Sequence, residues 1–230
     1  MRIKIQRESL VEYVVPELEG ATLLEVLNHI KTKIDPSFTY SSGCRSSVCG
    51  SCSVRVNERE VLACAHKVND GDVVTPLKNL EIIRDLVVNM DKALSFNVAS
   101  RAWLKPLSDT PNLSQEDEKI NEIQSDCILC GSCYSACPVY AVNEEFKGPF
   151  SLTRVWKYVS DKREGDAKDK IDVIQTDGVW DCTLCNECTL VCPQEISSKA
   201  DIEKLRMKSA GYGYSDPNFA NMNFDGGLSF

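Results

Sequence analysis

The sequence has few histidines, no long apolar run and no excess of positive charge, and each shortage excludes a class of protein. Its 230 residues contain two histidines, with 26 Lys and Arg against 34 Asp and Glu, giving a formal net charge of −8. This acidic balance argues against a protein that binds nucleic acid. No eighteen consecutive residues are apolar, so we expect no membrane-spanning helix, which leaves docking onto a membrane protein open. The opening MRIKIQRESLVEY lacks the apolar segment of a secretory signal peptide.

Cysteine, in contrast, is abundant. With 12 cysteines and 43% hydrophobic residues, the chain can form a packed core and is much longer than a secreted disulfide scaffold. We therefore interpret the cysteines as reduced metal ligands made in a reducing compartment. They form three sets of four, with none left over: Cys44, Cys49, Cys52 and Cys64; Cys127, Cys130, Cys133 and Cys137; Cys182, Cys185, Cys188 and Cys192.

The second and third sets lie in a repeated stretch. Asp126–Pro138 reads DCILCGSCYSACP and Asp181–Pro193 reads DCTLCNECTLVCP, with seven of thirteen positions identical. This is the spacing of bacterial ferredoxins with two cubane clusters, in which the fourth cysteine of each run ligates the other cluster. The repeat therefore predicts two ligand sets that exchange their fourth members: Cys127, Cys130, Cys133 and Cys192 for the first cubane, and Cys182, Cys185, Cys188 and Cys137 for the second.

Zinc is the alternative metal for these runs. A tetrahedral zinc site usually takes two ligand pairs separated by a longer loop, whereas each run here places three cysteines on one tight turn. The spacing therefore favours iron–sulfur clusters. Pro138 and Pro193 follow the fourth cysteine of each run, and we expect each proline to begin a helical turn.

The first set has the spacing C-x4-C-x2-C followed by a distant cysteine, which is typical of a plant-type [2Fe–2S] cluster. Gly43, Gly50 and the neighbouring serines allow the backbone to wrap closely around such a cluster. A Rieske centre would need two histidine ligands. His29 falls inside a predicted helix, and His66 lies two residues after Cys64, so we expect neither histidine to be a ligand.

Local patterns predict an α+β protein with a small sheet followed by helices. A capping box at Thr22–Glu25 indicates the start of the first helix. Strands are expected at residues 1–7, 12–15, 53–56, 61–63 and 73–75, and further helices at 81–96, 116–125, 138–145, 151–162 and 195–208. The predicted domains are a [2Fe–2S] domain at 1–100, a connector at 101–115 and a helical domain with two clusters at 116–210. The tail at 211–230 is either a frayed terminus or an arm laid against a partner.

These motifs in this order resemble the iron–sulfur subunit of succinate dehydrogenase and fumarate reductase. The resemblance rests on SSGCRSSVCGSC with VLAC, on LEIIRDLVVNMDKAL and on both CP runs, and it covers roughly residues 1–208. It implies a β-grasp N-terminal domain and an all-helical ferredoxin-like C-terminal domain. It also implies that this subunit relays electrons in a succinate/fumarate oxidoreductase complex and has no catalytic residues of its own.

The same resemblance implies two partners. One is an FAD-containing flavoprotein that interconverts succinate and fumarate, and the other is a membrane anchor or another subunit that handles quinone. The complex would be peripheral to a membrane, on the cytoplasmic face by default, or on the exported face if the flavoprotein carried this subunit across. The sequence does not indicate whether succinate oxidation or fumarate reduction dominates.

The chain departs from the family's common form at two positions. In that form the third centre is [3Fe–4S], and a residue other than cysteine stands where this chain has Cys185. Cys185 therefore predicts a second [4Fe–4S] cluster, as in members that lack an ordinary haem-bearing anchor; the alternative is a [3Fe–4S] centre with Cys185 as a spare thiol. Some members also carry a tryptophan shortly after the first CP, near the quinone, where this chain reads CPVYAV with Tyr140.

Three other functions remain open at this point. Thiol-linked fumarate reductase and other flavoprotein dehydrogenases also use an iron–sulfur subunit with paired cubanes. A free soluble ferredoxin-type carrier would act without a complex. An adaptor that binds zinc would carry no electrons at all, and its solutions would be colourless.

Overall fold

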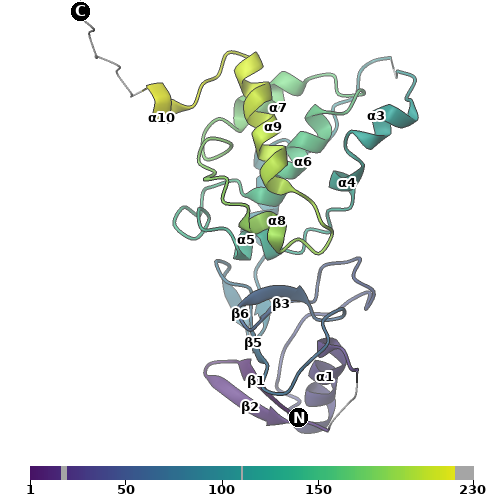
Figure 1. Cartoon of the computed structure of the whole chain (residues 1–230), viewed down its shortest axis with the longest axis vertical. Coiled ribbons are helices and arrows are strands. Elements are labelled where there is room, and N and C mark those ends of the chain that lie inside the picture. Colours follow the sequence, from purple (N-terminus) through teal and green to yellow (C-terminus); the bar gives the residue numbers. More distant parts are fainter. Residues whose placement is uncertain (17–19, 110, 221–230) are drawn as a thin grey trace, which may run out of the picture.

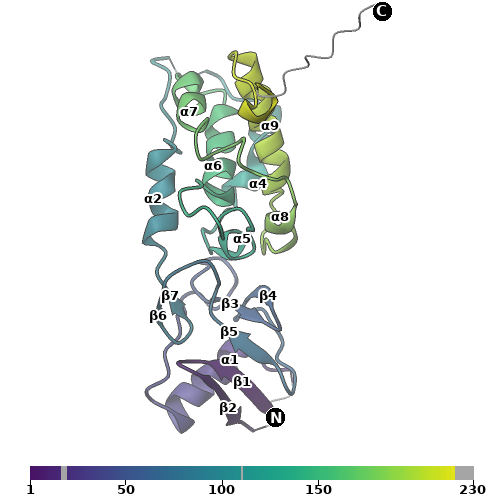
Figure 2. The same ribbon diagram turned by 90° about the vertical axis from the view of Figure 1, so that its left-hand side faces the viewer.

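A computed structural model describes residues 1–16, 20–109 and 111–220. The strands gather at one end of the elongated molecule and most of the helices at the other (Figure 1). The turned view in Figure 2 shows the same two regions, with the short helices α5 and α8 at the end of the helical region that faces the strands. The expected α+β architecture is therefore confirmed.

The N-terminal region contains a five-stranded mixed sheet. Its strand order is β2-β1-β5-β3-β4, in which β1 runs parallel to β5 and every other pair is antiparallel. The strands are β1 (Arg2–Gln6), β2 (Leu10–Val14), β3 (Ser53–Val56), β4 (Arg59–Leu62) and β5 (Val73–Thr75). This topology, with one helix packed on the sheet, is the expected β-grasp arrangement.

Helix α1 (Leu23–His29) covers the sheet and continues into a short π-helical segment, η1 (Ile30–Ile34). The predicted capping box is present, because the Thr22 hydroxyl accepts a hydrogen bond from the Glu25 amide at 3.3 Å and the Glu25 carboxylate accepts from the Thr22 amide at 2.7 Å. The core of this region consists of wholly buried side chains from the helix and the sheet: Ile3, Ile5, Leu23, Val26, Leu27 and Val74.

The predicted helix at 81–96 is wrong over its first half. Strands β6 (Ile82–Arg84) and β7 (Val87–Val88) form a hairpin there, and helix α2 begins only at Asp91 and ends at Ala99. The reason lies outside the segment. Asp85 adopts a left-handed φ of 48°, and its carboxylate accepts hydrogen bonds from Arg7 Nε at 2.9 Å and from the Thr39 amide at 2.8 Å. These tertiary contacts outweigh the helical periodicity of the segment.

The helical region is built around α6 and α9, which lie against each other, while α2 packs on α6 from another side. Their buried faces supply Phe150, Leu152, Val155, Ile202 and Leu205 to one core. The helices are α3 (Gln115–Lys119), α4 (Glu122–Ser125), α5 (Ser132–Ser135), α6 (Pro149–Val159), α7 (Ala167–Val173), α8 (Glu187–Leu190), α9 (Ser198–Gly211) and α10 (Pro217–Ala220). The predicted helices at 151–162 and 195–208 thus correspond to α6 and α9, and the one at 116–125 is divided into α3 and α4.

No helix begins at either proline of the CP runs. Residues 138–145 form turns, so the helix predicted there is wrong, and turns also follow Pro193. The amide of Tyr140 donates to Cys137 Sγ at 3.4 Å, and the amide of Ile196 donates to Cys192 Sγ at 3.4 Å. Amides that a continuous helix would direct to carbonyl oxygens are thus directed to sulfur.

The domain boundaries at residues 100 and 115 remain predictions. Half of the predicted tail, residues 221–230, lies outside the described residues. Within the part of the chain that is described, no helix has both the length and the apolar character needed to cross a membrane.

Candidate iron–sulfur sites

The first cysteine set lies on a loop that directs amide groups at sulfur. The amides of Ser46 and Val48 donate to Cys44 Sγ at 3.3 and 3.4 Å, and the Cys44 amide donates to Cys49 Sγ at 3.3 Å. The first two hydrogen bonds lower the pKa of the exposed Cys44 thiol to about 6. Because the thiolate is the form that binds metal, this loop is prepared to ligate one.

The other two members of this set lie deeper. Burial is the main factor that raises the pKa of Cys52 to about 11, with the nearby Cys64 and Cys49 thiols contributing. The Ser47 hydroxyl lies 3.6 Å from Cys64 Sγ. Arg45 and Ser47 have left-handed φ values of 61° and 63°, which wrap the loop back on itself. The structure thus brings Cys44, Cys49, Cys52 and Cys64 together, as the spacing predicts.

The two repeated runs adopt the same local backbone. Leu129 and Leu184 occupy equivalent positions with φ values of 53° and 56°, and the next equivalent pair, Gly131 and Asn186, has values of 81° and 73°. Glycine and asparagine are the two residue types that most readily accept this left-handed conformation. Each run therefore makes the same tight turn, and the repeat in sequence is a repeat in structure.

A cavity lies where the two runs meet; about 380 Å³ there is free of protein atoms, a volume that includes open solvent. Its wall contains three cysteines of the first run and the fourth cysteine of the second run: Cys127, Cys130, Cys133 and Cys192. Burial raises the pKa of Cys127, and the nearby Cys130 and Cys192 thiols raise it further. Residues from both runs therefore enclose one space, in the combination predicted for the first cubane.

The remaining four cysteines form the reciprocal group. Burial raises the pKa of Cys188 to about 12, and the neighbouring Cys182, Cys137 and Cys185 thiols add to that shift. Burial also raises the pKa of Cys137, to which Cys182 and Cys185 contribute. Cys185 is the exposed member of this group, whereas Cys137 and Cys188 are buried.

The donor set tests which group these residues fit. All twelve cysteines are free thiols. Among the described residues, no three Cys, His, Asp or Glu side chains gather around one point as a single ion requires. In a cluster, the irons lie between the thiolates and hold them farther apart than a single zinc ion does, at about 2.3 Å per Zn–S bond. Sulfur-only sets spread around a larger space therefore fit iron–sulfur clusters better than zinc.

The cluster loops of the two regions touch each other at Gly50. A Cβ atom added to Gly50, whose φ is 70°, would lie 2.8 Å from both Cys130 Cβ and the Ile128 carbonyl oxygen. Only glycine permits this approach, which places a residue between Cys49 and Cys52 directly against a cysteine of the first cubane set. Gln194 Nε2 also donates to the Ser47 carbonyl at 3.0 Å. The sequence showed that Gly50 was needed near a cluster but not that it faces a second one.

Neither histidine belongs to a site. His29 lies in the last turn of α1, and His66 Nε2 lies 3.7 Å from an Asp72 carboxylate oxygen. Tyr140 is a core residue with 2% of its surface exposed, and its ring packs edge-on against Tyr134 at 4.8 Å between centroids. Sequence reasoning missed Arg206, which donates to the Cys182 carbonyl at 2.6 Å; its position in α9 gave no signal of that contact.

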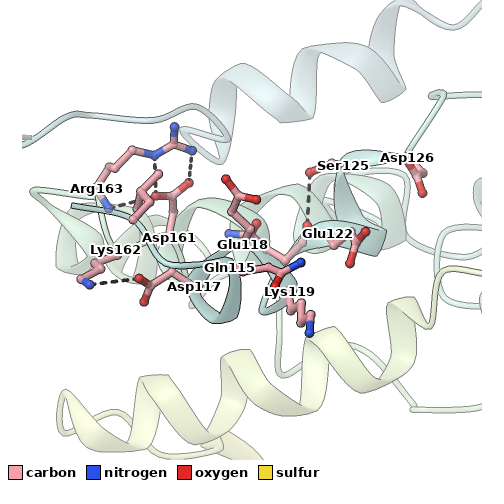
Figure 3. A pocket seen from close by; sticks show the side chains of 12 residues that line it. Gln115, Asp117, Glu118, Lys119, Glu122, Ser125, Asp126, Asp161, Lys162 and Arg163 are labelled. Atoms are coloured by element: carbon pink, nitrogen blue, oxygen red, sulfur yellow. Dashed lines mark hydrogen bonds and ion pairs between the residues drawn. The ribbon is translucent and has the colours of Figure 1, made fainter. Parts of the chain in front are cut away.

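A large groove away from the cysteines has a structural role (Figure 3). It has room for about 400 Å³ of water-sized molecules and is lined mostly by charged side chains of α3, α4 and the segment after α6. Lys162 pairs with Asp117 at 3.0 Å, and Arg163 pairs with Asp161 at 2.6 Å. The Lys162–Asp117 pair connects α3 to the segment after α6, whereas the Arg163–Asp161 pair lies within that segment.

Comparison with known proteins agrees with this geometry. Residues 2–95 match the family model of a 2Fe-2S iron-sulfur cluster binding domain, and residues 123–196 match that of a 4Fe-4S dicluster domain. The fumarate reductase iron-sulfur subunit of Haemophilus influenzae is 34% identical over 229 residues, covering 89% of this chain and 88% of that protein.

Two further similarities extend the comparison. The mitochondrial succinate dehydrogenase [ubiquinone] iron-sulfur subunit of Dictyostelium discoideum is 29% identical over 205 residues, covering 81% of this chain and 71% of that protein. A chain of the Mycobacterium smegmatis Sdh1 complex in the apo form shares the fold, with a TM-score of 0.79 at 23% identity over 94% of this chain and 98% of that one. The chain therefore belongs to the family of iron–sulfur electron-transfer subunits of fumarate reductase and succinate dehydrogenase.

Proposed function

We propose that the twelve cysteines hold three clusters in a row, through which this subunit passes single electrons between a flavoprotein and a membrane-side partner. When bound, each cluster supplies reversible one-electron chemistry. The proposed ligands are Cys44, Cys49, Cys52 and Cys64 for [2Fe–2S]; Cys127, Cys130, Cys133 and Cys192 for the first [4Fe–4S]; and Cys137, Cys182, Cys185 and Cys188 for the second.

The observation that carries this proposal is the shared cavity between the two runs. Three thiols of one run and the last thiol of the other line a single space, which the exchange of fourth ligands requires. A carrier with two independent sites would instead enclose four thiols of the same run. Contact of Gly50 with Cys130 supports the order in which the three sites follow one another, from the N-terminal loop to the first cubane and then to the second.

Cys185 supports a complete second cubane. Its thiol is near those of Cys137 and Cys188, where it adds to the pKa values that burial raises. Because Cys185 is exposed, it would hold the fourth iron from the surface side of this site. A [3Fe–4S] centre would instead leave Cys185 as a spare, exposed thiol.

The partners follow from the family rather than from the site. We propose an FAD-containing flavoprotein that acts on succinate or fumarate beside the exposed Cys44 loop, and a membrane-anchor or quinone-handling subunit beyond the second cubane. The complex would lie at the cytoplasmic face of a membrane. Because Tyr140 is buried in the helical core, it does not present an aromatic ring to a quinone, which favours an unusual anchor or another redox subunit as the electron partner.

Anaerobic purification of the native complex tests the proposal. We expect about ten irons for each chain, the content of one [2Fe–2S] and two [4Fe–4S] clusters, together with a copurifying flavoprotein. The oxidised protein should give no stoichiometric [3Fe–4S] signal by electron paramagnetic resonance (EPR). A colourless protein that contains zinc, or far fewer irons, would overturn the cluster proposal; a chain that elutes alone from gel filtration of the native extract would indicate a free carrier.

A further inference from the structure

Arg206 of α9 is bonded to the backbone that carries Cys182. Its Nε donates to the Val179 carbonyl at 2.8 Å, and its Nη2 donates to the carbonyls of Trp180 at 3.3 Å and Cys182 at 2.6 Å. The guanidinium also lies over the Trp180 ring, 5.5 Å from its centroid. Three hydrogen bonds and a stacked ring fix one cation beside the first cysteine of the second run.

Glu203 lies one helical turn before Arg206 and is on the same face of α9. Because Arg206 is bonded to the Cys182 backbone, the face of α9 that carries both charges is turned toward the second run. Glu203 is paired with Lys199 at 2.9 Å, and its side chain is 42% exposed. The better fixed of the two opposed charges is therefore the cation.

We propose that α9 sets the reduction potential of the second cubane, with Arg206 raising it and positioning the Cys182 loop while Glu203 lowers it. The inference rests on the ligand set proposed above. Reduction adds a negative charge to a cluster, so a fixed neighbouring cation stabilises the reduced form and an anion destabilises it. Net charge and hydrogen bonding near the sulfurs are among the properties by which a protein sets such potentials.

Arg154 of α6 provides a matched comparison at the first cubane. It follows Thr153, which lines the first cavity, yet its Nη2 donates to the Tyr158 hydroxyl at 3.4 Å rather than to a loop that carries cysteine. It therefore contributes a charge to the first site without holding the backbone. Removing either arginine should shift the potential of its own cluster, so the two variants identify which reduction step belongs to which site.

The test is a potentiometric titration of the anaerobically purified full chain, monitored by EPR. Arg206→Gln should lower the equilibrium constant for reducing the second cubane about tenfold, which is equivalent to lowering its potential by about 59 mV for one electron. Arg154→Gln should instead lower the potential of the first cubane. Arg206→Lys keeps the charge, so it should lower the potential of the second cubane less than Arg206→Gln does. It should still release iron faster than the wild type, because the Cys182 loop loses its hydrogen bonds. Lys208→Gln removes an exposed charge of the same helix and should shift neither step.

Glu203→Gln changes a charge on α9 without removing a hydrogen bond to the Cys182 loop. It removes only an exposed pair with Lys199, which contributes little to stability, and should shift the second cubane several-fold toward reduction. The assignment of tuning to α9 would be overturned by either of two results. In one, neither Arg206→Gln nor Glu203→Gln changes the potential of either reduction step; in the other, each variant shifts the two potentials equally. Wild-type protein without two cubane steps would instead overturn the ligand sets themselves.

Discussion

The two cluster-binding regions assemble their sites in different ways. In the N-terminal region, one loop and the turn at Cys64 supply all four thiols, beside a sheet that has its own core. In the helical region, each proposed site takes thiols from two runs that begin 55 residues apart, and the runs include α5 and α8, which have four residues each. Helices this short are not stable alone. From this comparison we predict that the sheet holds its cluster, whereas the clusters help to hold together the helical region, whose core lies around α6 and α9.

Removing one exchanged ligand should have the largest effect. We expect Cys192→Ala to remove the cluster of the first run, about four of about ten irons, and to leave the second cubane less affected, because Cys192 lies in the wall of the first cavity. Iron analysis and EPR of the anaerobic variant measure both losses.

The matched control for Cys192→Ala is Cys64→Ala in the N-terminal region. It should cost the [2Fe–2S] cluster while both cubanes remain, since its thiol lies with Cys52 rather than with either run. If Cys192→Ala instead removed the cluster of its own run and spared the first, the exchange of ligands would be wrong.

The pH dependence of stability should also differ between the regions. Burial raises the pKa of Asp201 in α9 to about 6, so its carboxylate destabilises the folded helical region as pH rises from about 4 through 6. In the N-terminal region, hydrogen bonds from Ser37 and Tyr13 and the charge of Arg7 lower the pKa of Asp35 to about 2. Asp35 therefore stabilises that region above pH 4, and this contribution is lost only as the pH falls toward 2.

Asp201→Asn tests the larger of these two effects. The substitution removes the buried charge. The amide oxygen of Asn still accepts the hydrogen bond from Gln124 Nε2, which lies 2.9 Å from Asp201 Oδ1. We expect a gain of about 2 kcal/mol in the free energy of unfolding of the helical region at pH 7, shrinking toward pH 4. Hydrogen exchange of α9 and β1 measures the two regions separately; a gain that is equal at pH 5 and pH 7 would contradict the buried-charge account.

The contact between the regions should give a smaller effect. Gly50→Ala places a methyl group 2.8 Å from Cys130 Cβ, which costs roughly 1 to 3 kcal/mol beyond the strain of a left-handed alanine. Gly71→Ala is the control, because Gly71 has a φ of 86° and no atom within 4 Å of an added Cβ. We expect Gly50→Ala to lose more stability and to slow electron transfer from the [2Fe–2S] cluster to the first cubane. Equal losses in thermal unfolding would mean that the loops do not press together at this position.

Local patterns were sufficient to predict much of this molecule. Strands β3 and β5 occupy the predicted residues, the capping box at Thr22 is present, and the repeated runs meet as their spacing indicated. The predictions that failed depend on distant partners. The turn at Asp85 is fixed by Arg7 and Thr39, and the contact of Arg206 with Cys182 requires α9 to lie beside the second run. The left-handed conformation shared by Gly131 and Asn186 could have been predicted from their residue types, because glycine and asparagine accept it most readily.

Iron removal from the intact chain tests most directly whether the clusters hold the helical region together. After anaerobic chelation of all iron, we expect the amides of α6 and α9 to lose protection from hydrogen exchange, while those of β1 and β5 retain it. Helices that stay protected when no iron remains would contradict the account, since their packing would then be independent of the thiols that join the two runs.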